Sequence, residues 1–246
     1  MKKLLFLILF FSLSINAQDY YLHVGKLFNS NEGKMLDNMT IIVSGNKIKD
    51  IKKGYELPEN DNSVIIDLKD STVMPGFIDL HVHIESEYNP EKYLNEFTAE
   101  ESEIAFSSLK FAKRTLMAGF TTVRDLGGSG VNISLRNAIN KGEVIGPRIF
   151  TAGKAIGTTG GHADPTNGWK KSIAGDPGPQ DGVINGVDDA RKAVRERYKN
   201  GADVIKITAT GGVMSIAKNG QNPQFTIEEI KAICETANDY DMIVAA

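Results

Sequence analysis

The stretch Val73-Met74-Pro75-Gly76-Phe77-Ile78-Asp79-Leu80-His81-Val82-His83-Ile84 decides the fold of this 246-residue chain. Its Pro-Gly start and the short apolar run that follows predict a buried strand. Side chains alternate along a strand, so His81 and His83 share one face, with Asp79 behind them, and the apolar residues between face whatever covers the sheet. Two imidazoles in this position either bond backbone carbonyls or bind a metal ion, and their pairing favours the metal.

Lys206 is the second informative residue. It lies in the stretch GADVIKITATGG, residues 201–212, where a strand predicted over 202–207 places Lys206 inside the sheet. Burial disfavours an ammonium ion and lowers its pKa, which leaves a free amine. A free amine can add CO2 to form a carbamate, an anionic group that can hold two divalent cations. Alternatively, the side chain extends to solvent from the strand end or pairs with a carboxylate.

These two stretches together resemble the amidohydrolase superfamily, metal-dependent hydrolases built on a (β/α)8 barrel. PGFIDLHVHI, residues 75–84, resembles its metal-binding strand 1, and residues 201–212 resemble its strand 4, whose lysine is carboxylated and bridges two metals. The finer resemblance, from about residue 20 to the last residue, is to the branch of Xaa-Pro dipeptidases and imidazolonepropionase-like proteins. It implies two zinc ions held by His81, His83 and carboxylated Lys206, which would activate water and polarise a carbonyl.

Three parts are expected along the chain. Residues 1–18 are typical of a signal peptide, with Lys2 and Lys3 before an apolar run too short to span a bilayer comfortably. This predicts a secreted or periplasmic protein without stable membrane insertion after cleavage, the alternative being a retained anchor. Residues 19–74 predict a small β-sandwich, and the resemblance implies that its missing strands come from the far C-terminus of a full-length protein.

Residues 75–246 alternate between strand and helix patterns, which predicts an α/β fold with a parallel sheet. The resemblance implies an incomplete (β/α)8 TIM-type barrel holding strands 1–4 and the start of strand 5. A polar loop is expected over 85–100, a long functional loop over 153–186, and Cys234 in the core. The expected strands cover 76–83, 120–125, 148–152, 202–207 and residues from 242. The expected helices cover 101–118, 131–141 and 188–200, the last with Asp188 as its N-cap. A further helix is expected after a capping box formed by Thr226 and Glu229.

Four further residues have alternative roles. His162 lies between glycines in the long loop and could contact a substrate carboxylate or carbonyl, or be an ordinary exposed histidine. Arg124 ends a strand and could bind a substrate carboxylate or form a structural pair. His23 lies far from the motifs and is expected to be structural. Asp79 could orient His81 or serve the strand itself.

Composition excludes several classes of function. The net charge of −3 gives no reason to expect nucleic acid or an anionic membrane as partner, and a single cysteine excludes an internal disulfide framework. The expected activity is cleavage of a C–N bond in a small substrate, with an Xaa-Pro-type dipeptide favoured and a cyclic amide as alternative.

The resemblance also places two further histidine ligands and a proton-shuttling aspartate beyond residue 246. No catalytic residue is therefore expected within the chain, and an inactive fragment or an interaction module is the non-catalytic alternative. A homo-oligomer is considered only for the full-length protein.

Overall fold

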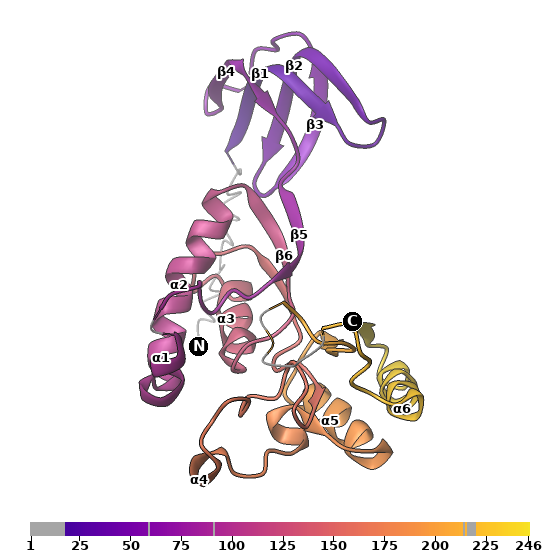
Figure 1. The fold of residues 1–246 in the computed structure, drawn as a ribbon. Helices are drawn as coiled ribbons and strands as arrows, with labels where there is room; N and C mark the ends of the chain where they lie inside the picture. The colour runs from indigo at the N-terminus through magenta and orange to yellow at the C-terminus, as the bar shows by residue number, and fades with distance from the viewer. Residues whose placement is uncertain (1–17, 59, 91, 214, 216–219) are drawn as a thin grey trace, which may run out of the picture. The chain divides into compact units, whose positions relative to one another are not determined.

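The computed structural model describes residues 18–58, 60–90, 92–213, 215 and 220–246. The signal-peptide prediction for residues 1–18 lies outside these ranges except at Gln18. Internal contacts divide the chain into two compact units that meet between Pro75 and Gly76, and each unit is described by itself (Figure 1). Among the helices so described, none is long and apolar enough to cross a membrane.

The first unit is a mixed sheet of four strands in the order β3-β2-β1-β4 (Figure 1). Hairpins join β1 to β2 and β2 to β3, whereas β4 runs parallel to β1. In the described part of this unit one sheet is present, so the second layer of the predicted sandwich stays a prediction. The strands are β1 (Asp19–Asn29), β2 (Lys34–Ser44), β3 (Lys47–Lys53) and β4 (Val64–Val73).

Apolar side chains from one face of this sheet form its core, among them Val24, Leu27 and Ile41. His23 is buried nearby, and its Nε2 is 2.8 Å from the backbone oxygen of Glu56. A buried imidazole bonded to a backbone carbonyl has its polar atom satisfied within the fold. The structural role predicted for His23 is therefore confirmed.

The second unit alternates strands and helices. Strands β5, β6 and β7 form one parallel sheet, and β10 and β11 form another. The N–H of Asp203 donates to the C=O of Thr151 at 2.8 Å, which links β7 to the start of β10. Five strands thus follow one another in chain order. They are β5 (Phe77–Val82), β6 (Phe120–Asp125), β7 (Arg148–Thr151), β10 (Val204–Lys206) and β11 (Ile243–Ala245).

Helices pack on these strands in two groups. Leu135 of α3 and Ala112 of α2 meet Val123 of β6 in one core, and α5 and α6 pack together over β10 in a larger one. Amphipathic helices that cover a parallel sheet in this way are what the alternating sequence pattern predicts. The helices are α1 (Lys92–Thr98), α2 (Glu101–Met117), α3 (Val131–Asn140), α4 (Lys171–Ala174), the 3-10 helix η1 (Pro179–Asp181), α5 (Val187–Lys199) and α6 (Ile227–Asn238).

The predicted capping box at the start of α6 is confirmed. The hydroxyl of Thr226 accepts from the N–H of Glu229 at 3.2 Å, and Oε2 of Glu229 accepts from the N–H of Thr226 at 2.8 Å. Oε1 of the same buried carboxylate accepts from the N–H of Gly186, the N-cap of α5, at 2.6 Å. The predicted N-cap of α5, Asp188, is wrong, because the helix begins one residue earlier and Asp188 lies in its first turn.

Three other predictions of local structure are corrected. The expected loop over 85–100 contains the helix α1. Cys234 is exposed, because the buried stripe of α6 runs through Ala232, Ile233 and Ala237, and residue 234 lies beside it. Ile78 and Leu80, expected to be covered, have exposed fractions of 62% and 57%, and no described residue covers them further.

The long segment 153–186 is held by side chains from its neighbours. It contains the short parallel pair β8 (Gly157–Thr158) and β9 (Val183–Ile184). Arg197 of α5, whose exposed fraction is 3%, donates from Nε to the C=O of Lys154 at 2.8 Å and from Nη1 to the C=O of Pro179 at 3.1 Å. One guanidinium therefore ties both ends of the segment to α5.

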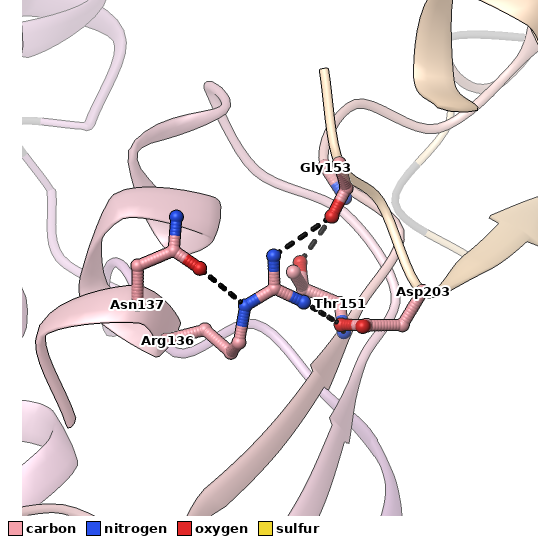
Figure 2. A network of polar contacts seen from close by, with 6 residues as sticks. Arg136, Asn137, Thr151, Gly153 and Asp203 are labelled. Carbon is pink, nitrogen blue, oxygen red and sulfur yellow. Dashed lines mark hydrogen bonds and ion pairs between the residues drawn. The ribbon is translucent and has the colours of Figure 1, made fainter. Parts of the chain in front are cut away.

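A second arginine joins α3 to the strands, as Figure 2 shows. Arg136 forms an ion pair with Asp203 and donates to the C=O of Gly201 at 2.8 Å. The same carboxylate accepts the N–H of Thr151 at 2.9 Å. This network fixes the end of β7 against the start of β10, and thereby the relative position of the strands that carry the candidate site.

Candidate functional site

His81 and His83 lie side by side at the C-terminal end of β5. Their ring centroids are 5.4 Å apart and the rings are tilted by 59°. Nδ1 of His83 is 2.8 Å from the backbone oxygen of Gly127, and because a carbonyl only accepts, Nδ1 carries the hydrogen. That tautomer leaves the lone pair of Nε2 available, which is how a carbonyl partner prepares a histidine to bind a metal ion.

Gly127 allows this approach of the backbone to the ring. Its φ of 151° lies in the region that favours glycine, and a Cβ there would stand 3.4 Å from Cε1 of His83. The structure gives Gly127 the role of hydrogen-bond acceptor for His83.

Lys206 lies at the end of β10 with an exposed fraction of 8%. Within the described part of the chain, its Nζ has neither a hydrogen bond nor an ion pair. Burial lowers its pKa, and the positive charge of Arg124 lowers the pKa further. The amine is therefore a stronger nucleophile at neutral pH than that of a solvated lysine.

The electrostatics of His81 place it in the same group. The pKa of its imidazole is lowered, first by loss of solvent around the ring and then by the positive charges of Lys206, His83 and Arg124, with Asp79 acting in the opposite direction. The charged groups that shift the pKa of His81 thus come from β5, β6 and β10, or directly follow them. The neutral imidazole that results is the form that binds a metal.

These residues fit part of a metal site. Imidazole nitrogens are ordinary zinc ligands, and a lysine carbamate would add the oxygen ligands that the group lacks. In the residues that the structure describes, no cluster of three or more His, Cys, Asp and Glu side chains could hold a metal ion. A metal here would therefore depend on Lys206, together with His81 and His83, rather than on a carboxylate cage.

Arg124 points its guanidinium at the backbone of the neighbouring strand. Its Nε donates to the C=O of Leu80 at 2.7 Å. Asp79 likewise serves the backbone, since its Oδ1 accepts the N–H of His81 at 2.9 Å. For Arg124 the structural pairing is the one observed, and its binding of substrate stays a prediction, whereas the contact of Asp79 is with the backbone of His81 itself.

His162 is held against the loop that follows β10. Its N–H donates to Oε1 of Gln224 at 2.8 Å, and its Nδ1 is 2.5 Å from the hydroxyl of Ser215. A Cβ on Gly212 would stand 2.9 Å from the ring, so a glycine is needed there. The loop around His162 therefore docks at the strand ends, and its role in substrate binding stays a prediction.

A buried acid beside this region was missed in the sequence. Asp125, the last residue of β6, is fully buried, and neither carboxylate oxygen has a hydrogen bond of normal geometry. Burial raises its pKa to about 7, with a smaller contribution from Glu85, although the Asn132 amide and nearby backbone N–H groups offset part of the rise. The only sign of it in the sequence is an aspartate at the end of a predicted strand, directly before Leu126-Gly127-Gly128.

Comparison with known proteins places these residues in context. A sequence model described as the Amidohydrolase family matches residues 72–246. Ochratoxinase from Aspergillus niger is 31% identical over 231 residues, which cover 87% of this chain and 47% of that protein.

Two solved structures agree with this match. A Xaa-Pro dipeptidase with bound methionine in its active site is 50% identical, with a TM-score of 0.85, covering 92% of this chain and 56% of that one. The crystal structure of A. niger ochratoxinase gives a TM-score of 0.77 at 27% identity, covering 93% of this chain and 55% of that one. The chain thus spans about half the length of the relatives it matches.

Proposed function

The chain belongs to the amidohydrolase family, and we propose that it carries part of the binuclear zinc site of a hydrolase that cleaves the C–N bond of an Xaa-Pro-type dipeptide. The observation that carries this proposal is the convergence of His81, His83 and Lys206 at the ends of β5 and β10. Two adjacent imidazoles beside a buried amine that has no hydrogen bond in the described residues do not suit an apolar core, and they supply the donor groups that a metal site needs.

Each of these residues has a distinct task. Lys206 would add CO2 through its free amine with release of one proton, and the resulting carbamate would supply oxygen ligands to the metal. His83 presents Nε2 because its Nδ1–H is bonded to Gly127, and the pKa of His81 is lowered by loss of solvent around its ring and then by its cationic neighbours, which favours the neutral form. Zinc bound there would polarise an amide carbonyl and activate water at neutral pH.

The choice of substrate rests on charge and on one relative. Arg124 places positive charge at the site, which suits a small substrate with a free carboxylate such as a dipeptide. The Xaa-Pro dipeptidase that is 50% identical supports the same choice. Hydrolysis of a cyclic amide remains the second prediction from the sequence.

We infer that activity needs residues beyond the span described. The family resemblance implies two more histidines and an aspartate on later strands, and relatives are about twice as long as the matched span. The same proposal includes the (β/α)8 barrel and the sandwich subdomain over residues 19–74. It also includes export through residues 1–18 and a homo-oligomer of the whole protein. Residues 1–246 alone are accordingly expected not to hydrolyse dipeptides.

Metal content and intact mass test the proposal directly. The protein is purified with zinc and bicarbonate, and metal is counted by elemental analysis while mass spectrometry follows Lys206. We expect a peptide containing Lys206 to gain the mass of one CO2, which acid removes, and Lys206→Met to lose both that gain and the bound zinc.

His23 offers a matched control for the histidine ligands. His81→Gln combined with His83→Gln should abolish zinc binding, whereas His23→Gln should leave it unchanged, because His23 is bonded to Glu56 far from these motifs in the sequence. Equal zinc content in the double variant and the unaltered protein would refute the assignment.

A further inference from the structure

The ladder between β5 and β6 contains an irregularity at His81. Asp79 pairs with Val123, and the next pair is Val82 with Asp125, so β5 advances farther than β6. One residue of β5 is therefore extra, and the pair Leu80–His81 faces Arg124 alone. Such an extra residue is a β-bulge, a feature that is rare between parallel strands and is used next to active sites to redirect a side chain.

A single peptide group is released by this bulge, and side chains hold it at both ends. The C=O of Leu80 accepts from Nε of Arg124 at 2.7 Å, and the N–H of His81 donates to Oδ1 of Asp79 at 2.9 Å. These two groups belong to one peptide bond, whose atoms are coplanar and whose C=O and N–H point in opposite directions. Fixing both fixes the plane from which the Cα–Cβ bond of His81 departs.

We propose that Arg124 and Asp79 are positioning residues, which clamp the Leu80–His81 peptide plane and thereby aim the His81 imidazole at the metal position. The identity of His81 as a ligand rests on the proposed function, whereas the clamp itself does not. Metal ligands are commonly oriented by bonds to their rings. Here the ring of His83 is oriented in that way, by Gly127, and the ring of His81 is oriented through its backbone.

A second irregularity upstream restores the register. Phe77 pairs with Phe120 and Ile78 with Thr122, so Thr121 is extra on β6. A Cβ on Gly76 would lie 2.1 Å from Oγ1 of Thr121, so a glycine is needed opposite the extra residue. The two slips compensate, and the N–H of Leu126 reaches the C=O of Val82 at 3.0 Å. The strands thus keep their pairing on both sides of a displaced segment.

Substitutions at Arg124 separate this role from substrate binding by its charge. Glutamine carries an N–H donor at the position along the side chain that Nε occupies in arginine, but it has no charge. Methionine has a similar length and no donor. The clamp therefore predicts that the His81 ring signals and amide exchange in Arg124→Gln match those of the unaltered protein and that those in Arg124→Met do not. A role that needs the guanidinium charge predicts that both variants fail.

Asp79 provides an independent pair of variants on the other side of the peptide. Asp79→Asn keeps the Oδ1 acceptor, and Asp79→Ala removes it. Arg148 provides the control, because it is exposed and donates to the side chain of Thr122 on β6 rather than to a backbone group. Arg148→Gln and Arg148→Met should both leave every readout at His81 unchanged.

The first measurement uses metal-free protein. The chain has four histidines, so its imidazole nitrogen NMR spectrum can be assigned by single His→Gln variants. We expect Arg124→Met and Asp79→Ala to shift the His81 ring signals and to speed exchange of the His81 amide about fivefold, the effect of losing one hydrogen bond. Arg124→Gln and Asp79→Asn should restore both readouts.

The second measurement titrates the same variants with Co2+ and follows its visible absorption. Losing the clamp should weaken Co2+ binding about tenfold, with the conservative variants staying near the unaltered protein. Unchanged His81 signals in Arg124→Met, or equal loss in Arg124→Gln and Arg124→Met, would overturn the clamp. If the unaltered protein bound no Co2+, the proposed function would fail, while the exchange rates would still decide the clamp.

Discussion

Replacing Asp125 by asparagine should stabilise the protein at alkaline pH. The carboxylate is fully buried without a hydrogen bond of normal geometry, and its pKa is about 7 in place of the ordinary 3.8. The folded state therefore holds a proton between these two values that the unfolded state has released. The contribution of Asp125 to the free energy of unfolding consequently falls as pH rises through this window, and it levels off above pH 7.

The magnitude follows from the size of the shift. A rise of about three pKa units corresponds to about 4 kcal/mol at 1.36 kcal/mol per unit. Asp125→Asn keeps the shape and removes the charge, so it should raise the free energy of unfolding by up to about 4 kcal/mol at pH 8 and change it little at pH 4. The difference between the two proteins, plotted against pH, should be a single rising curve.

Urea unfolding followed by circular dichroism at a series of pH values measures this difference. Asp176→Asn, at an exposed position of the long segment, is the matched control and should run parallel to the unaltered protein. A constant difference between Asp125→Asn and the unaltered protein from pH 4 to 8 would refute the reasoning. So would an Asp125→Asn protein that is less stable at pH 8.

Three further substitutions test the supports of the fold by urea unfolding at neutral pH. Arg136→Met removes the partner of Asp203 in the network of Figure 2. Because the pair is only partly buried, we expect the free energy of unfolding to fall by about 2 kcal/mol. An unchanged free energy of unfolding would show that the network is dispensable. Gly182→Ala should cost about 2 kcal/mol, since φ is +95° and the new Cβ would lie 2.3 Å from the C=O of Ala155; a neutral effect would contradict that geometry. Thr226→Ala removes one bond of the capping box and should cost about 1 kcal/mol, with Thr226→Ser retaining it; equal losses in both would point to the methyl group instead.

Local patterns in the sequence predicted most of the second unit. The strand Phe120–Asp125 has the predicted bounds, because a segment rich in aromatic and β-branched residues is framed by Gly119 and Gly127. The start of α6 could be predicted because a capping box has a recognisable sequence pattern, here Thr226 and, three positions later, Glu229. The family itself followed from two short motifs and is confirmed by the match over residues 72–246.

Features that depend on how distant segments meet could not be predicted in this way. The bulge at Leu80–His81 exists only in the register between β5 and β6, which strand periodicity does not specify. The burial of Asp125 depends on the packing of α3 against β6, and the sequence shows only a polar residue at a strand end. For Cys234, the apolar stripe was set one residue off, which moves a side chain by about 100° around the helix.

The carboxylate of Glu229 has a consequence for how the second unit opens. One of its oxygens closes the first turn of α6, and the other receives the backbone N–H at the start of α5. Two helices that belong to successive strand-helix repeats are thus nucleated on a shared anion. Fraying of either helix weakens the other, so this half of the protein should gain or lose its order as one cooperative block rather than repeat by repeat.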